Sequence, residues 1–177
     1  SDREHLCQSL ADIMTIEKRL FRTEGVKVAW IGDGNNVCMS LILSTILTGM
    51  EVIVASPSEF APGEDVVSEA LRMGAKVRIV TDPREAATGA DVVMTDTWIS
   101  MGQEEEIDRR RQIFMPYQVN AELMACAKPG AIVMHCLPAH RNWEITDEVL
   151  DSKASAVWDQ AENRLHAQKA LLVRLLA

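Results

Sequence analysis

The sequence is poor in several residue types, and each shortage argues against a class of protein. It has 4 cysteines among 177 residues, without C-x-x-C spacing, which argues against a disulfide scaffold and favours free thiols in a reducing, cytoplasmic compartment. Lys and Arg number 18 against 26 Asp and Glu, and the net charge of -8 argues against nucleic acid as a partner. No apolar run reaches the roughly 20 residues that span a bilayer, so no membrane segment is expected. Small-molecule partners are favoured.

Short apolar runs rich in β-branched residues recur along the chain, separated by segments long enough for crossover helices. This rhythm is typical of a parallel sheet. We predict an α/β fold: a doubly wound, Rossmann-like parallel sheet of about five strands with helices on both faces, forming a single domain over residues 1–177. Because the chain starts at Ser1 rather than Met, we interpret it as part of a longer protein or as an engineered chain. The predicted strands lie near 26–31, 51–55, 76–80, 91–95 and 131–135.

Helices are predicted between these strands and at both ends of the chain. Three crossover helices are expected over 36–48, 64–73 and 120–127. The charge run over 104–111 is interpreted as a solvated helical start, with a mobile lid as the alternative. The first and last helices each carry a stripe of apolar residues and are expected to bury it. These stripes are Leu10, Ile13, Met14, Leu20 and Phe21 in the first helix, and Leu165, Leu172, Leu175 and Leu176 in the last.

The motif His135-Cys136-Leu137-Pro138 directly follows an apolar strand and is the strongest indication of an active site. Ligands of parallel α/β sheets bind outside the carboxyl ends of the strands. Two other strands end in unusual residues: 26–31 runs into Gly32-Asp33-Gly34-Asn35-Asn36, and 91–95 runs into Asp96 and then Ser100-Met101-Gly102. We expect these three segments to meet in one crevice.

Together with residues 159–164, these segments resemble the ornithine-binding half of the ornithine carbamoyltransferase family, over essentially the whole chain. The resemblance implies transfer of the carbamoyl group of carbamoyl phosphate to the side-chain amine of L-ornithine, giving citrulline and phosphate without a cofactor. The family's Ser-x-Arg-Thr phosphate motif has no counterpart here, which implies that the carbamoyl-phosphate-binding domain is absent. The chain alone is then expected to turn over very slowly or not at all.

The resemblance also implies roles for residues on the ornithine side. Asn36 matches a residue that contacts the amino-acid head of ornithine, and Asp96 matches one that holds its ammonium groups. Ser100 and Met101 match a loop that closes over ornithine. Cys136 matches a residue beside the side-chain nitrogen, where it positions the amine and stabilises charge. No covalent intermediate on this thiol is implied.

Residues on the carbamoyl phosphate side follow in the same way. His5 and Gln8 match a His-Pro-x-Gln motif that holds the carbonyl and amide of carbamoyl phosphate, with Leu6 in place of the proline. Arg164, which we expect to open the last helix, matches a residue that contacts the same substrate. Leu137 matches a residue that presents its carbonyl to the substrate, next to a cis bond before proline. His5 and Arg164 would donate to the carbonyl oxygen during the reaction.

Each candidate also has a structural explanation. The segment at 32–36 can be a tight turn with an Asn helix cap, and Asp96 can be a helix or turn cap. Cys136 can be a small buried residue, His5 a satisfied or exposed group, and Arg164 a solvated helix end. A nicotinamide-binding domain is disfavoured because the glycine pattern lacks its third small residue. A noncatalytic unit that self-associates through the terminal helices is a further alternative. His140 and His166 match no metal spacing, so no metal site is expected.

Overall fold

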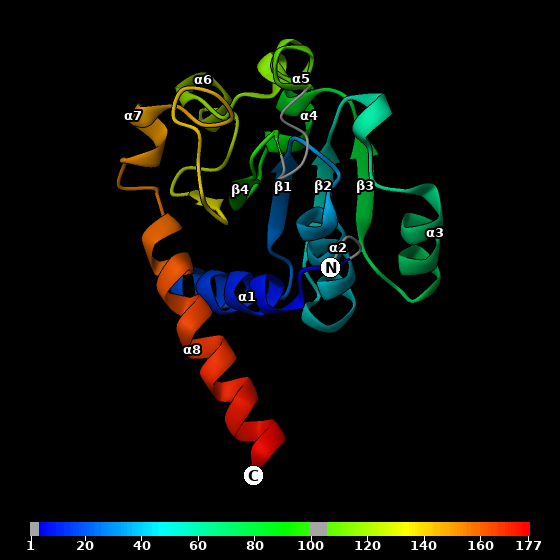
Figure 1. The fold of residues 1–177 in the computed structure, drawn as a ribbon, viewed down its shortest axis with the longest axis vertical. Coiled ribbons are helices and arrows are strands. Elements are labelled where there is room, and N and C mark those ends of the chain that lie inside the picture. The colour runs from blue at the N-terminus through cyan, green and yellow to red at the C-terminus, as the bar shows by residue number, and fades with distance from the viewer. Residues whose placement is uncertain (1–3, 100–105) are drawn as a thin grey trace.

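The computed structural model describes residues 4–99 and 106–177, and its centre is a parallel five-stranded sheet in the order β3-β2-β1-β4-β5 (Figure 1). The chain builds the sheet outward from β1 to β3 and then returns to the other side of β1, so the direction of winding reverses between β1 and β4. This is the predicted doubly wound α/β fold. The strands are β1 (Lys27–Ile31), β2 (Glu51–Ala55), β3 (Val77–Val80), β4 (Val92–Thr95) and β5 (Ile132–His135).

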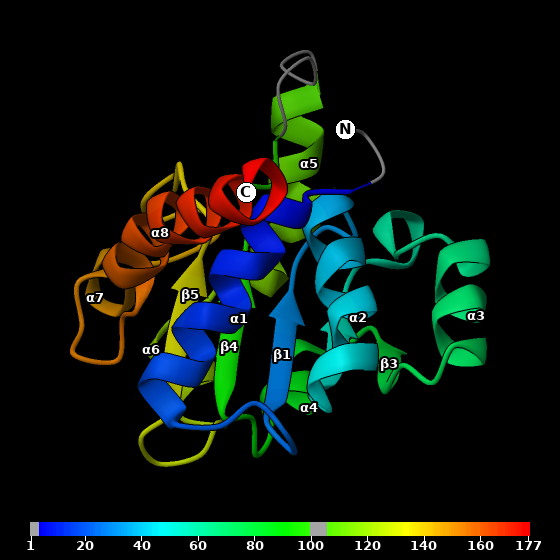
Figure 2. The same cartoon turned by 90° about the horizontal axis from the view of Figure 1, so that it is seen from below.

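Helices cover both faces of the sheet, as Figure 2 shows from a second direction. Strands β4 and β5 are buried along their whole length, and β1 and β2 from their second residue onward, which explains why they read as continuous apolar runs. One face packs on α1 (Leu6–Leu20), α2 (Asn36–Thr48) and α3 (Glu64–Arg72). The other packs mainly on α4 (Pro83–Ala87), α5 (Ile107–Phe114), α6 (Ala121–Met124) and α7 (Asp147–Leu150), with the 3-10 turns Ser58–Phe60 and Met115–Tyr117.

The predicted crossover helices are present, and the third is shorter than expected. Helix α2 covers the predicted 36–48, and α3 ends one residue before the predicted Met73. Asn120 caps α6 through its side-chain oxygen, which accepts from the Leu123 N–H at 3.0 Å. From Cys126 onward the backbone switches to bonds three residues apart, as it turns toward Pro129 and Gly130.

The prediction for the first helix was wrong about which face is buried. Phe21 is 92% exposed and Leu10 is also exposed, whereas Ile13 and Leu20 pack only partly on the core. The buried face of α1 is instead largely polar, because α8 (Val157–Leu176) lies against it and supplies polar partners. The buried residues of α1 are Gln8, Ser9, Ala11, Asp12, Thr15 and Ile16.

Helix α8 is anchored at its beginning and projects from the body at its end (Figure 1). Val157, Gln160 and Asn163 are its buried residues. The predicted burial of its apolar stripe was therefore wrong: the four leucines are exposed, because nothing among the described residues covers them. No helix in the described part of the chain is long and apolar enough to cross a membrane.

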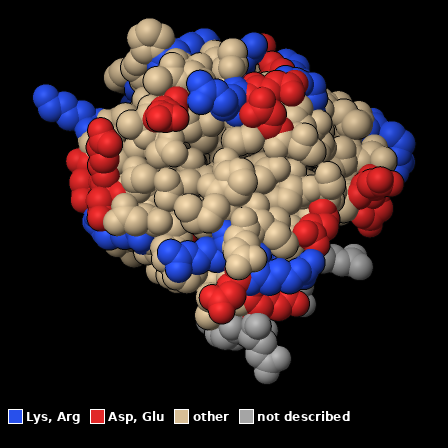
Figure 3. All heavy atoms as spheres, turned by 90° about the horizontal axis from the view of Figure 1, so that it is seen from above, with Lys and Arg blue, Asp and Glu red and all other residues tan. Residues whose placement is uncertain are grey.

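The surface opposite the projecting end of α8 shows charges of both signs. On the face drawn in Figure 3, basic and acidic side chains lie interspersed around an uncharged centre. No continuous basic surface is visible there. That the chain does not bind a phosphate backbone stays a prediction.

Asp91 forms hydrogen bonds with three separate segments at the amino end of β4. Its carboxylate accepts from the Lys27 N–H at 2.9 Å and from Lys128 Nζ at 2.9 Å, and Arg22 Nη2 lies 3.1 Å away. Burial alone would raise the pKa of Asp91, but these donors and cations outweigh it and lower the pKa. The ionised carboxylate therefore stabilises the start of the central strand pair β1–β4.

We predict that Asp91→Ala lowers the free energy of unfolding by about 2 kcal/mol at neutral pH, since hydrogen bonds to charged groups contribute about 1.5–3 kcal/mol. Because the Asp91 pKa is lowered in the folded chain, the difference from wild type should be fully present above about pH 4 and should be lost as the pH falls through the lower folded-state pKa. Urea denaturation at several pH values measures this. Asp151→Ala, which breaks an exposed pair with Arg141, is the control and should have a smaller effect. Equal effects would contradict the assignment.

Candidate functional site

The register of the sheet brings Asp96 and Cys136 together. Thr95 pairs with His135 at the carboxyl ends of β4 and β5, so the residues that follow each strand leave the sheet side by side. Cys136 Sγ donates to Asp96 Oδ1 at 2.8 Å. Both lie next to the switch in winding direction between β1 and β4, where ligands of such sheets bind. Two of the three segments predicted to meet therefore do so through a direct hydrogen bond.

The β1 segment joins this pair through Asn35. Its amide nitrogen donates to Asp96 Oδ2 at 2.7 Å, while its oxygen caps α2 by accepting from the N–H groups of Val37 and Cys38. The predicted Asn cap is therefore Asn35. Asn36, the candidate for substrate contact, is the first residue of α2 and is half-buried.

Asp96 is a buried carboxylate held by dipoles. Besides Asn35 and Cys136, the Thr97 N–H donates to it at 2.7 Å. Among residues 4–99 and 106–177, no Lys or Arg forms an ion pair with it. A buried anion is costly unless donors or a cation compensate it, so this position favours a cationic ligand group.

The Cys136 thiol keeps its proton. Burial raises its pKa well above the ordinary thiol range, and the negative charge and acceptor oxygen of Asp96 raise it further. A protonated thiol donates hydrogen bonds but is a poor nucleophile. The geometry thus fits positioning rather than covalent catalysis. All four cysteines are free, as predicted.

The turn after β5 is organised by the buried His135. The Leu137 N–H donates to His135 Nδ1 at 2.9 Å, so Nε2 carries the ring proton and donates to Glu144 Oε1 at 3.1 Å. Leu137 has φ +59°, a left-handed conformation that is uncommon for leucine. The Leu137–Pro138 peptide bond is cis, as the resemblance implied.

Asp96, His135 and Cys136 also offer three metal-ligand types within 4.8 Å of one another. However, both ring nitrogens of His135 already have partners, and the Cys136 sulfur holds a proton. A metal ion would have to replace these bonds. The absence of a metal site stays a prediction.

Gln8 and Arg164, two further predicted site residues, contact each other. Arg164 Nη1 donates to Gln8 Oε1 at 2.6 Å. The prediction that Arg164 opens the last helix was wrong: α8 begins at Val157, so Arg164 lies two turns inside it and reaches across to α1. Its interpretation as a solvated helix end is therefore also wrong.

His5 lies at the cap position that precedes α1. Its N–H donates to Ser40 Oγ at 2.7 Å, and its carbonyl accepts from the N–H groups of Gln8 and Ser9. Burial, together with the positive charge of Arg164, lowers the His5 pKa, so the ring is neutral at pH 7. Leu6 occupies the first helical position, where a proline would also fit, and the helix begins there without one.

Arg110 was missed by sequence reasoning. The charge run was interpreted as solvated, yet Arg110 is 3% exposed, pairs with Asp33 and donates to the Trp98 carbonyl at 2.5 Å. Its guanidinium also lies 4.5 Å from the centre of the Phe60 ring. The apolar Phe114, one helical turn later, was the available signal. Ser100, Met101 and residues 104–105 lie outside the described residues.

Comparison with known proteins places this arrangement in a family. Residues 24–175 match the aspartate/ornithine carbamoyltransferase Asp/Orn binding domain. The chain belongs to the aspartate/ornithine carbamoyltransferase family. It is 98% identical over 177 residues to the ornithine carbamoyltransferase of Methanospirillum hungatei JF-1, covering 100% of this chain and 59% of that protein. It is 53% identical to the enzyme of Archaeoglobus fulgidus, covering 99% of this chain and 57% of the relative.

Solved structures agree with this family assignment. The ornithine carbamoyltransferase of Pyrococcus furiosus matches with a TM-score of 0.91 at 51% identity, covering 97% of this chain and 56% of that one. The Campylobacter jejuni anabolic enzyme gives 0.92 at 35% identity, covering 99% and 59%. The chain thus spans somewhat more than half the length of its relatives. Membership in this family argues against the nicotinamide-binding alternative.

We predict that Asp96→Asn makes Cys136 react several-fold faster with iodoacetamide at about pH 8, because removing the neighbouring charge lowers the thiol pKa and raises the thiolate fraction. Mass spectrometry of the labelled peptides measures the rate. Cys126 provides the internal reference, and its reaction rate should not change. Asp151→Asn is the matched control variant, in which Cys136 should react at the wild-type rate. An unchanged or slower rate at Cys136 would show that Asp96 does not control the thiol.

Proposed function

We propose that this chain is the ornithine-binding part of an ornithine carbamoyltransferase, which converts carbamoyl phosphate and L-ornithine to L-citrulline and phosphate in the cytoplasm. The observation that carries the proposal is the buried Asp96 carboxylate, held beside the Cys136 thiol at the switch point of the sheet without a described cationic partner. An ammonium group of ornithine would supply that cation.

The reaction requires a neutral amine beside the carbonyl carbon of carbamoyl phosphate. The amine lone pair forms a bond to that carbon, the bond from carbon to the bridging oxygen breaks, phosphate leaves, and the amine nitrogen loses a proton to phosphate or water. Asp96 and Cys136 would position ornithine, Asn36 would contact its amino-acid head, and the Leu137 carbonyl would accept from it. This is catalysis by alignment, which needs no covalent intermediate.

The negative charge that develops on the carbonyl oxygen needs donors. His5 lies at the start of α1, and Arg164 lies on α8, which packs beside it. Gln8 on α1 accepts from Arg164 and so lies between the two helices. The neutral His5 ring donates from one nitrogen, and the Arg164 guanidinium donates from several. Gln8 would hold the amide of carbamoyl phosphate. Ser100 and Met101 would cover bound ornithine.

The proposed site is incomplete in this chain. Because the chain spans 57–59% of the length of its relatives, the residues that bind phosphate are expected in a second domain supplied by the remainder. The isolated chain should therefore bind ornithine weakly and turn over little or not at all. No cofactor enters the proposed reaction.

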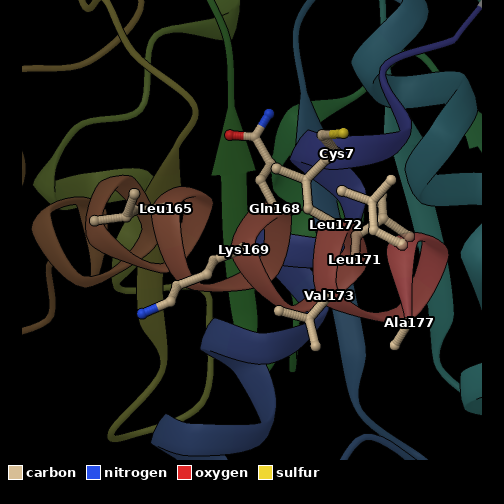
Figure 4. A pocket seen from close by; sticks show the side chains of 9 residues that line it. Cys7, Leu165, Gln168, Lys169, Leu171, Leu172, Val173 and Ala177 are labelled. Carbon is tan, nitrogen blue, oxygen red and sulfur yellow. The ribbon is translucent and has the colours of Figure 1, made fainter.

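A noncatalytic, self-associating unit is the second candidate, and the exposed face of α8 favours it. Trp158, Leu165 and Leu172 recur every seven residues along this helix and are all exposed, a spacing typical of helix pairing. Between distal α8 and Cys7 lies a hollow of about 870 Å³ with a mainly apolar lining (Figure 4). Glu162 lies in the proximal half and Arg174 in the distal half, so an antiparallel second copy would bring opposite charges together.

We predict saturable amide shifts at Asn36, Asp96 and Cys136 when L-ornithine is titrated into the labelled chain. Asp96→Asn should weaken binding about 10- to 100-fold, since an ion pair with a buried carboxylate contributes about 1.5–3 kcal/mol. Asp151→Asn is the matched control, and putrescine, which lacks the carboxylate, should bind more weakly than ornithine. The proposal fails if no saturable shifts occur, with or without carbamoyl phosphate.

We predict that the chain self-associates in a concentration-dependent way through α8. Leu165→Gln combined with Leu172→Gln should shift it to monomer, because the paired apolar face is removed. Leu47→Gln, at a residue on α2 that is 91% exposed, is the control and should leave the assembly unchanged. Size-exclusion chromatography with light scattering measures the mass. A monomer at every concentration tested would sink this candidate.

A further inference from the structure

Asp12 has no role in the reaction as described, yet it is a fully buried carboxylate near the proposed site. It lies on α1 with 0% exposure, facing α8. Its Oδ1 accepts two hydrogen bonds of 2.7 Å, one from Gln8 Nε2 on its own helix and one from Gln160 Nε2 on α8. Its Oδ2 has no partner among the described residues.

These two bonds determine which way each amide points. Since an amide has a donor end and an acceptor end, donation from nitrogen to Asp12 directs the oxygen the opposite way. Gln8 Oε1 accepts from Arg164 Nη1 at 2.6 Å, and Gln160 Oε1 accepts from the His135 N–H at 2.9 Å. One carboxylate therefore orients groups that reach both halves of the proposed site.

The reversed orientation of Gln8 would be unfavourable. A flipped amide would place its NH2 group against the Arg164 guanidinium, leaving two donors facing each other, and would turn its oxygen toward the Asp12 carboxylate. Without an acceptor at position 12, the bond to Arg164 alone would hold the amide. The interaction with Asp12 thus specifies the orientation from the buried side.

Gln8 also separates the two charges. Among the described residues, Arg164 forms no ion pair with a carboxylate, and its Nη1 donates to a neutral amide. A direct bond to Asp12 would neutralise the guanidinium. With the amide between them, Arg164 is oriented while its positive charge stays available to an anionic or carbonyl ligand.

We propose that Asp12 is a positioning residue for the carbamoyl-binding half of the site: it fixes the Gln8 amide so that Oε1 faces Arg164 and the amide donors of carbamoyl phosphate. This inference rests on the proposed function. Burial raises the pKa of Asp12 to about 7, and the partnerless Oδ2 can take the proton while Oδ1 keeps accepting. The orientation of Gln8 is therefore compatible with both protonation states.

The test compares variants of this chain by the NMR signals of the Gln8 and Gln160 side-chain amides and of the Arg164 guanidinium. Asp12→Ala removes the acceptor, and these signals should shift and broaden. Asp12→Asn keeps an acceptor oxygen and can place its nitrogen at the partnerless position, so it should retain the wild-type pattern. Asn163→Ala breaks the α1–α8 bond to Thr15 without touching Asp12, and it controls for looser helix packing.

Ligand titration then tests whether the orientation of the Gln8 amide affects the binding of carbamoyl phosphate. For carbamoyl phosphate, Asp12→Ala should raise the dissociation constant about tenfold, whereas Asp12→Asn and Asn163→Ala should change it less than about twofold. Inorganic phosphate has no amide, and its main binding residues are expected in the second domain, so its weak binding to this chain should be the same in all variants. If Asp12→Ala does not give a dispersed spectrum, Asp12→Ser, whose hydroxyl is too short to reach both amides, takes its place.

Unchanged Gln8 and Arg164 signals in a folded Asp12→Ala or Asp12→Ser chain would overturn the inference. So would equal weakening of carbamoyl phosphate binding by Asn163→Ala, which would assign the effect to helix packing. Disordered Gln8 signals in the variant, together with no ornithine binding by wild type with or without carbamoyl phosphate, would support the positioning of Gln8 and overturn the proposed function alone.

Discussion

The pairing of β4 with β1 on one side and β5 on the other is the constraint on which the site depends. Ile31, Thr95 and His135 align across these three strands, so the residues that follow them leave the sheet at one level. A slip of one residue between β4 and β5 would turn Cys136 to the opposite face and break its bond to Asp96. The apolar cores on both faces oppose such a slip, because it would exchange the side chains that pack on one face with those that pack on the other. The packing of the apolar core thus keeps Cys136 within hydrogen-bonding distance of Asp96.

Polar groups inside the molecule are compensated in pairs and small networks rather than singly. Arg110 meets Asp33, His135 meets Glu144, and Asp12 meets two amides. Each buried charge carries a desolvation cost that only local donors or opposite charges can offset. The α1–α8 interface follows the same rule, since it is joined by amides and hydroxyls where an ordinary helix pair would use leucine. Such an interface specifies one alignment of the helices, because every donor needs its own acceptor.

The sequence predicted those features whose cause is local. Apolar runs identified the strands, Gly74 marked the end of α3, and the position of Asp96 after its strand indicated the edge where it lies. What failed depended on tertiary partners. The buried face of α1 is polar because α8 supplies Gln160 and Asn163, and no periodicity within α1 encodes that. Arg110 looked like one of three solvated cations until Asp33, 77 positions away, was placed beside it.

The projecting end of α8 turns small motions of its anchor into large displacements. Twelve residues beyond Arg164 extend about 18 Å at a rise of about 1.5 Å per residue. A tilt of about 10° at the contacts with α1 would therefore move the last turn by about 3 Å. A segment joined covalently after Ala177 would be displaced by the same tilt. The direction of the displacement would be set by the contacts of Asp12, Gln160 and Asn163 between α1 and α8.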